Sequence, residues 1–173
     1  MTDYLFLDIK TLSVTYEEYD ALYKAAVDLA TKAHKGQKDR GGDDYINHPK
    51  RVAEKCDTIL QKITALLHDV VEDSKYTLDD LRKHKTIGKY PQIINAVECL
   101  THKKGESYGD YINKVMTNPT ALCVKIRDLE DNLNCLRLPD MTEKDWDRMK
   151  KYYNARKTLI ECYKKYRYES FNQ

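Results

Sequence analysis

Apolar residues recur at helical spacing along most of this chain. Between residues 15 and 34, leucines and alanines follow one another at intervals of three and four, which places them on one face of a helix. This segment opens with Thr15-x-x-Glu18, the spacing of a capping box, and Gly36 follows its end. Strict alternation of apolar and polar residues never persists, so the pattern predicts an all-α fold.

Two further segments are apolar enough to be buried. Residues 58–73 contain the run from Ile63 to Leu67 followed by two valines, and this segment predicts the central buried helix. Residues 121–136 predict a second buried helix that ends at Leu136. Helices are also expected over these shorter ranges: Pro49 to about Lys55, a short stretch after Thr77, Pro91 to about Leu100, Tyr108 to Met116, and about 143–167.

Length and charge narrow the class of protein. The 173 residues suit one domain, 1–173, and the six glycines and four prolines fall between the predicted helices without forming a linker. Lys and Arg number 30 against 28 Asp and Glu, and a net charge of +2 gives no electrostatic reason to expect binding to nucleic acid or a membrane. No run of 18 apolar residues occurs, so no transmembrane helix is expected.

Two features favour a cytoplasmic location. The segment Met1–Lys10 lacks a basic start followed by a long apolar run, so it does not resemble a secretory signal. The five cysteines are an odd number, widely spaced and without a CxxC pair, which predicts reduced, mostly buried thiols rather than disulfides or a zinc site.

A polar group of residues interrupts the most apolar predicted helix. His68, Asp69, Glu72 and Asp73 follow the apolar run at spacings that place them on one helix face. A buried carboxylate is costly unless it is paired or bound to a metal, and several carboxylates together repel one another unless a cation lies among them. The pattern therefore indicates a metal site, with a solvated, acidic helix end as the alternative.

Other ligands are needed to surround an ion. His48 lies where a loop enters a helix at Pro49, and Asp128 lies within the second apolar helix. Imidazole and carboxylate ligands together suit manganese, iron and similar divalent ions. The alternatives are that His48 is a turn residue and that Asp128 pairs with Lys125. The remaining histidines are expected at the surface or as helix caps: His34, His84 and His102.

Four strings occur in order along the chain: Ala33-His34-Lys35-Gly36-Gln37; Tyr45-Ile46-Asn47-His48-Pro49 with Val52-Ala53; Ala65-Leu66-Leu67-His68-Asp69-Val70-Val71-Glu72-Asp73; and Val124-Lys125-Ile126-Arg127-Asp128 with Asn132. Together they resemble the HD hydrolase domain of the Rel/Spo stringent-response enzymes and the small alarmone hydrolases. The resemblance covers about residues 22–138. It implies a single HD-type domain, a bundle of about six to nine helices around a central metal site.

The resemblance also implies roles for individual residues. The metal ligands are the positions matching His48, His68, Asp69 and Asp128, and the ion in this family is usually manganese, Mn2+. The acidic pair implicated in catalysis matches Glu72 and Asp73. Residues expected near the substrate include a nucleotide contact, basic side chains that neutralise phosphates and tyrosines that stack on a base: Asn132, Arg40, Lys125, Tyr45 and Tyr108. For the basic residues and tyrosines, a surface or packing role is the alternative.

The function implied is hydrolysis of a nucleotide pyrophosphate, with (p)ppGpp as the expected small-molecule substrate and pyrophosphate leaving from its 3′ side. The alternatives are an HD nucleotidase acting on another nucleotide and a non-catalytic, nucleotide-binding regulatory module. One departure bears on the substrate: alarmone hydrolases usually have a basic residue at the position of Asp39, and here only Arg40 follows it. Asn134 and Cys135 also depart from the usual pattern. The oligomeric state is left open.

Overall fold

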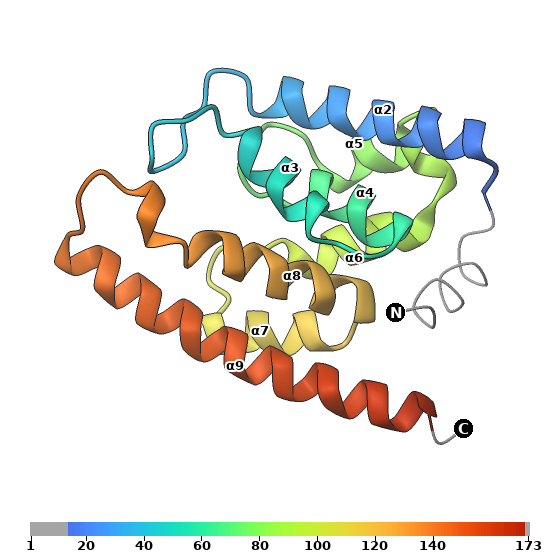
Figure 1. Ribbon diagram of the computed structural model, residues 1–173. Coiled ribbons are helices and arrows are strands. Elements are labelled where there is room, and N and C mark those ends of the chain that lie inside the picture. The colour runs from blue at the N-terminus through green and yellow to red at the C-terminus, as the bar shows by residue number, and fades with distance from the viewer. Residues whose placement is uncertain (1–13, 172–173) are drawn as a thin grey trace.

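The computed structural model describes the backbone of residues 14–171 and the side chains of residues 14–166, so Met1–Lys10 lies outside the described residues. Within the described part every regular element is a helix, apart from one isolated bridge between Lys38 and Asp44 (Figure 1). The all-α fold predicted from the sequence is therefore confirmed. Among the described helices, we find none with the length and apolar character that crossing a membrane requires.

The helices follow one another with short connections. Their bounds are α2 Tyr16–Ala33, α3 Asn47–Glu54, α4 Ile59–Leu67, α5 Leu78–Lys83, η1 Ile87–Lys89, α6 Pro91–Leu100, α7 Tyr108–Met116, α8 Pro119–Asn132, η2 Cys135–Arg137 and α9 Glu143–Phe171.

Side-chain caps begin several of these helices where the sequence predicts. At α2, Thr15 Oγ1 accepts a hydrogen bond from the Glu18 amide (3.2 Å), and Glu18 Oε2 accepts one from the Thr15 amide (2.8 Å). The pairs Thr77–Asp80 at α5 and Thr142–Asp145 at α9 repeat this arrangement. Each cap satisfies backbone amides that the first turn of a helix leaves without a partner.

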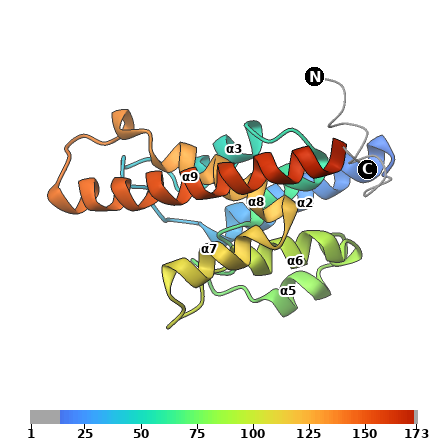
Figure 2. The same cartoon turned by 90° about the horizontal axis from the view of Figure 1, so that it is seen from below.

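The core is centred on α4, which contacts α2, α3, α6 and α8. Figure 1 shows α4 between α2 on one side and α8 on the other. Its segment Ile63–Leu67 is buried, so burial of apolar surface holds this helix in place. The long helix α9 packs against α7 and α8 (Figures 1 and 2), and its Leu159 is completely buried.

Two predicted helices end earlier than the apolar pattern suggests. Helix α4 ends at Leu67, where His68 Nδ1 hydrogen-bonds the carbonyl of Ala65 (2.6 Å), so that a side chain takes part in ending the helix. Residues 68–73 then form turns, and the prediction of one continuous helix over 58–73 was wrong.

Helix α8 likewise ends at Asn132 rather than Leu136, because Arg137 donates a hydrogen bond to the carbonyl of Asp131 (2.7 Å) in its last turn. Leu136 lies in η2 and is 92% exposed.

His34 was expected at the surface or as a helix cap, and it is the C-cap residue of α2, whose backbone amide donates to the carbonyl of Ala30. It is only 3% exposed, because its ring packs 4.8 Å from the ring of Tyr45. The expectation that the thiols are mostly buried was wrong. Of the five cysteines, Cys56 is buried and Cys135 is exposed, while the other three are half-buried. The cap role expected for His84 is confirmed, since its Nδ1 accepts hydrogen bonds from the amides at the start of η1.

Candidate metal centre

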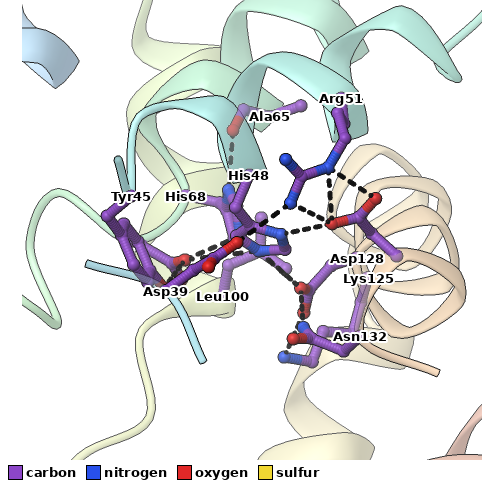
Figure 3. A network of polar contacts seen from close by, with 12 residues as sticks. Asp39, Tyr45, His48, Arg51, Ala65, His68, Leu100, Lys125, Asp128 and Asn132 are labelled. Atoms are coloured by element: carbon purple, nitrogen blue, oxygen red, sulfur yellow. Dashed lines mark hydrogen bonds and ion pairs between the residues drawn. The ribbon is translucent and has the colours of Figure 1, made fainter. Parts of the chain in front are cut away.

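Four side chains from three separate segments converge beside α4. His48 belongs to the first turn of α3, His68 and Asp69 follow α4, and Asp128 lies in α8. His48 Nε2 lies 3.1 Å from Asp128 Oδ1 and 3.7 Å from Asp69 Oδ2. His68 Nε2 lies 3.0 Å from Asp69 Oδ2 and 3.8 Å from Asp128 Oδ1. The structure therefore brings together all four residues that the sequence suggests as metal ligands. Figure 3 labels three of them, His48, His68 and Asp128.

The donor atoms fit a divalent transition-metal ion. One ligand atom each from His48, His68 and Asp69 lies within 4.8 Å of the others, as ligands of a single ion must. His68 is 2% exposed, and its buried Nε2 has no hydrogen-bond partner among the described residues, although it faces the two carboxylates. Two imidazole nitrogens and two carboxylate oxygens make a mixed set that suits manganese, iron or zinc.

The charges of this cluster also favour a cation. Burial opposes ionisation of Asp69 and Asp128, yet the neighbouring cationic groups lower the pKa of both carboxyls. For His68, burial alone lowers the pKa, but the two carboxylates raise it well above its usual value. The two carboxylates thus stabilise positive charge between the imidazoles, and a divalent ion that took the place of the imidazole protons would be stabilised by the same carboxylates.

The two acids expected to act in catalysis lie at the exposed rim of the cluster. Glu72 Oε2 accepts a hydrogen bond from the His102 amide (2.9 Å). Tyr45 donates from its hydroxyl to Asp69 Oδ2 (2.7 Å) and lies 3.3 Å from Asp73 Oδ2. Burial raises the pKa of both Glu72 and Asp73, and the negative charge of Asp69 raises both further. They reach this place through turns rather than along one helix face.

Lys125 and Asn132 both hold Asp128. Lys125 Nζ donates to Asp128 Oδ2 (2.7 Å), and Asn132 Nδ2 donates to Asp128 Oδ1 (2.5 Å), as Figure 3 shows. The pairing of Lys125 with Asp128, which the sequence left as an alternative, is therefore present.

The hydroxyl of Tyr108 is buried without a hydrogen-bond partner among the described residues, and Lys151 Nζ lies 4.6 Å from its ring centre.

A pocket opens beside the cluster. Tyr45, His48 and Asn132 contribute to its wall, together with three arginines: Arg40, Arg137 and Arg148. Of the residues predicted to contact substrate, the pocket thus contains Arg40, Tyr45 and Asn132, while Lys125 and Tyr108 are not among its lining. Arg40 forms an ion pair with Asp145, the cap of α9.

The carboxylate of Asp39 stabilises the loop that precedes α3. Its Oδ1 accepts hydrogen bonds from the amides of Gly41 (2.9 Å) and Asp43 (3.0 Å). Its Oδ2 lies 3.0 Å from Arg137 Nη1 and 3.4 Å from Arg51 Nη2. A Cβ on Gly41 would lie 2.6 Å from the carbonyl oxygen of Arg137, so this close approach requires glycine.

Sequence reasoning missed several residues at this site. Asp131 hydrogen-bonds His48, and it in turn binds Arg51 and Arg137. The available signal was a second aspartate three residues after Asp128 on an apolar helix. Arg148 was missed because its place depends on how α9 packs, which local spacing does not reveal.

No family model matches this chain, but it is similar to curated proteins named as pyrophosphohydrolases, pyrophosphokinases or bifunctional (p)ppGpp enzymes. It is 27% identical over 140 residues to a guanosine-3′,5′-bis(diphosphate) 3′-pyrophosphohydrolase of Aquifex aeolicus, covering 75% of this chain and 20% of the relative. It is 32% identical over 127 residues to a GTP pyrophosphokinase of Streptomyces coelicolor, covering 65% and 14%. With the bifunctional (p)ppGpp synthase/hydrolase SpoT of Escherichia coli it shares 27% over 148 residues, covering 77% and 21%.

The match thus spans only about a fifth or less of these curated relatives. Among solved structures, a metazoan ortholog of SpoT, described as hydrolysing ppGpp and playing a role in starvation responses, matches with a TM-score of 0.64 at 23% identity. That match covers 83% of this chain and 85% of the other chain. These similarities confirm the predicted resemblance to Rel/Spo enzymes and the all-α HD-type fold.

Proposed function

We propose that this chain is a metal-dependent phosphohydrolase that removes pyrophosphate from the 3′ side of a (p)ppGpp-type nucleotide. The observation that carries the proposal is the convergence of His48, His68, Asp69 and Asp128, with buried imidazole nitrogens facing ionised carboxylates. The names of the relatives support the substrate class. Manganese is the ion that we propose for the site.

His48, His68, Asp69 and Asp128 would hold the ion, which would supply Lewis acidity toward water and phosphate oxygens when bound. Around it, the chain's own groups set the geometry. Lys125 and Asn132 hold both oxygens of Asp128, and the Tyr45 hydroxyl holds Asp69. Ligands fixed in this way need little rearrangement when substrate binds, which favours catalysis.

Glu72 or Asp73 is the proposed acceptor of the proton that the attacking water loses. A general base works best when its pKa approaches the working pH. Burial and the charge of Asp69 raise the pKa of both carboxyls, in the direction that this role requires. The amide of His102 orients Glu72, and the Tyr45 hydroxyl lies beside Asp73. Asp73 therefore shares the Tyr45 hydroxyl with the proposed ligand Asp69, while the His102 amide fixes Glu72.

The pocket beside the ion is the proposed place for the nucleotide. Its three arginines, Arg40, Arg137 and Arg148, already form ion pairs with carboxylates of the protein. They are the proposed phosphate contacts, because a guanidinium has five N–H donors and can bind a phosphate in a bidentate manner beside an existing ion pair. Asn132 and Tyr45 face the same pocket and are the proposed contacts to the nucleoside. Lys125 and Tyr108 do not line this pocket, and they are the proposed phosphate contact and base-stacking residue at its edge.

One observation favours a second candidate, an HD nucleotidase acting on another nucleotide. Where alarmone hydrolases usually have a basic residue, Asp39 has a carboxylate whose two oxygens already bind backbone amides, Arg51 and Arg137. This residue therefore braces the loop and offers no positive charge to a substrate. Another nucleotide then becomes the alternative substrate for the same metal centre.

The decisive experiment incubates the purified full chain and Mn2+ with a nucleotide panel that includes ppGpp, pppGpp and ordinary mono- and triphosphates. Phosphorus NMR and chromatography then identify the products. Pyrophosphate and GDP from ppGpp support the proposal. Orthophosphate or triphosphate from another nucleotide favours the nucleotidase. If the chain binds Mn2+ but leaves the whole panel intact, it is the non-catalytic regulatory module.

A further inference from the structure

Both ring nitrogens of His48 have defined partners. Nε2 faces Asp128 and Asp69, while Nδ1 lies 2.8 Å from Oδ2 of Asp131. Asp131 is 2% exposed and follows Asp128 by three residues on α8, so one helix presents a carboxylate to each side of the same imidazole. His48 is therefore held between two buried carboxylates.

Asp131 is itself fixed by three cationic side chains. Arg51 Nε lies 3.1 Å from Oδ1 and 3.2 Å from Oδ2, and Lys55 Nζ lies 3.2 Å from Oδ1. Arg137 Nη2 lies 3.2 Å from Oδ2 and also binds the carbonyl of Asp131. Figure 3 shows the labelled Arg51 side chain beside His48, with dashed contacts from its guanidinium. These contacts leave the carboxylate one orientation, in which Oδ2 accepts from His48.

Two arginines extend this arrangement to the pocket. Arg51 and Arg137 each contact both Asp131 and Asp39, and Arg137 also lines the pocket. Positive and negative side chains thus alternate from the pocket wall to His48. Each of these charged side chains has a partner of opposite sign. They can therefore remain partly buried without the cost of an isolated buried ion.

We propose that Asp131 is a positioning residue for His48, which accepts the Nδ1 proton and so directs the unprotonated Nε2 toward the ion. This inference rests on the proposed function, because it takes His48 to be a metal ligand. A carboxylate that accepts the second ring proton fixes the tautomer and orientation of a ligating histidine and makes it a better donor to the metal. Losing such a partner typically weakens metal binding about 10- to 100-fold.

The neighbouring residue Glu130 provides a matched control. It is also an acid on α8 with arginine partners, since its carboxylate lies 3.0 Å from Arg127 Nη1 and 2.6 Å from Arg156 Nη2. Its partners are Arg127 on the same helix and Arg156 on α9, and among the described residues it forms no hydrogen bond or ion pair with His48. Glu130→Gln therefore removes a paired charge from the same helix and leaves the metal centre intact.

The test compares Asp131→Asn, Asp131→Leu and Glu130→Gln in the full chain. Calorimetric titration with Mn2+ is expected to show dissociation constants about 10- to 100-fold higher for Asp131→Leu, with a smaller increase for Asp131→Asn. Glu130→Gln is expected to bind Mn2+ as the parent does. Thermal unfolding of each variant separates loss of fold from loss of binding. If Asp131→Leu does not fold, Asp131→Asn decides, and parental affinity in a folded Asp131 variant overturns the inference.

A second readout does not depend on activity. With diamagnetic Zn2+ bound, proton and nitrogen-15 NMR of the His48 ring is expected to show an Nδ1–H shifted downfield by its hydrogen bond to Asp131 in the parent, and to lose that shift in Asp131→Leu. The same Nδ1–H shift in both proteins overturns the inference. If the parent shows the hydrogen-bonded Nδ1–H and binds Mn2+ but hydrolyses no nucleotide, the proposed function fails while the role of Asp131 stands.

Discussion

His48 Nε2 lies 3.1 Å from Asp128 Oδ1, and this contact joins the first turn of α3 to the middle of α8. Neither residue is near the other in sequence, and each helix packs on α4, which leads into His68 and Asp69. The candidate metal centre is therefore assembled by the packing of three helices. Its integrity and its chemistry can be tested separately.

Replacing Asp69 should remove the ion without unfolding the chain. Asp69→Ala deletes an oxygen that lies 3.0 Å from His68 and 3.7 Å from His48, so the remaining ligands no longer surround the ion. We expect loss of bound Mn2+ by elemental analysis and loss of hydrolysis, with an unchanged far-UV circular dichroism spectrum. Asp79→Ala, an exposed acid on α5, is the control. Equal metal content in Asp69→Ala and the parent contradicts the assignment.

Replacing Glu72 should separate metal binding from turnover. Its carboxylate lies at the rim, where it accepts a hydrogen bond from the His102 amide, and it is not among the proposed ligands. Glu72→Gln keeps that hydrogen bond but cannot take a proton. We expect parental affinity for Mn2+ and a fall in kcat of about 10²- to 10⁴-fold, the usual contribution of a general base. A parental kcat in this variant assigns the proton transfer to another group, with Asp73→Asn as the next variant to measure.

Metal binding should stabilise the folded chain. The ligands converge only in the folded state, so an ion that binds there shifts the unfolding equilibrium. With free Mn2+ at about 100 times its dissociation constant, the free energy of unfolding should rise by about 2.7 kcal/mol. Urea titrations with and without Mn2+ measure this difference. Asp128→Asn should abolish most of the increase, and an equal increase in that variant places the ion elsewhere.

Truncating Leu159 should loosen α9. This side chain is completely buried where α9 packs against α8, so Leu159→Ala removes apolar contacts and leaves a cavity. The free energy of unfolding should fall by about 2–5 kcal/mol, the usual cost of such a change. Lys157→Ala, two residues away and exposed, should change it by less than about 0.5 kcal/mol. Urea denaturation gives both values, and equal stability of the two variants argues against the packing of α9.

The ion pair between Glu106 and Lys114 should make a pH-dependent contribution to the stability of the chain. Lys114 Nζ lies 2.8 Å from both carboxylate oxygens, and this hydrogen bond, with that from the Lys103 amide, lowers the pKa of Glu106 from its usual 4.5. The pKa of the Glu106 carboxyl is thus lower in the folded chain than in the unfolded chain. Its contribution to the free energy of unfolding is fully present above the unfolded pKa, and it is lost as the pH falls through the folded pKa.

Melting temperatures of the parent and Glu106→Gln should therefore differ more near neutral pH than at about pH 3. A difference that stays constant over this range shows that the charge of Glu106 is not involved in the stabilisation. Because this pair is close to the surface, the difference itself should be small.

Local sequence determined where most helices begin and which faces they bury. The capping pairs Thr15–Glu18 and Thr77–Asp80, and the proline at residue 91, act on backbone groups within one turn, so their effect can be predicted from neighbouring residues alone. The apolar spacing in residues 15–34 and 58–67 likewise predicts a buried face, because helical period relates residues three and four apart. The fold class followed from these local rules.

Only the tertiary structure decided where α4 and α8 end and which charges meet. Arg137 closes the last turn of α8 from outside that helix, and Asp131 meets His48 only because α3 packs on α8. Arg40 is similarly committed to Asp145 of α9. The spacing of residues along the sequence cannot predict such contacts. They depend on how helices that are distant in sequence pack together, and on which side chains this packing brings within reach of a buried charge.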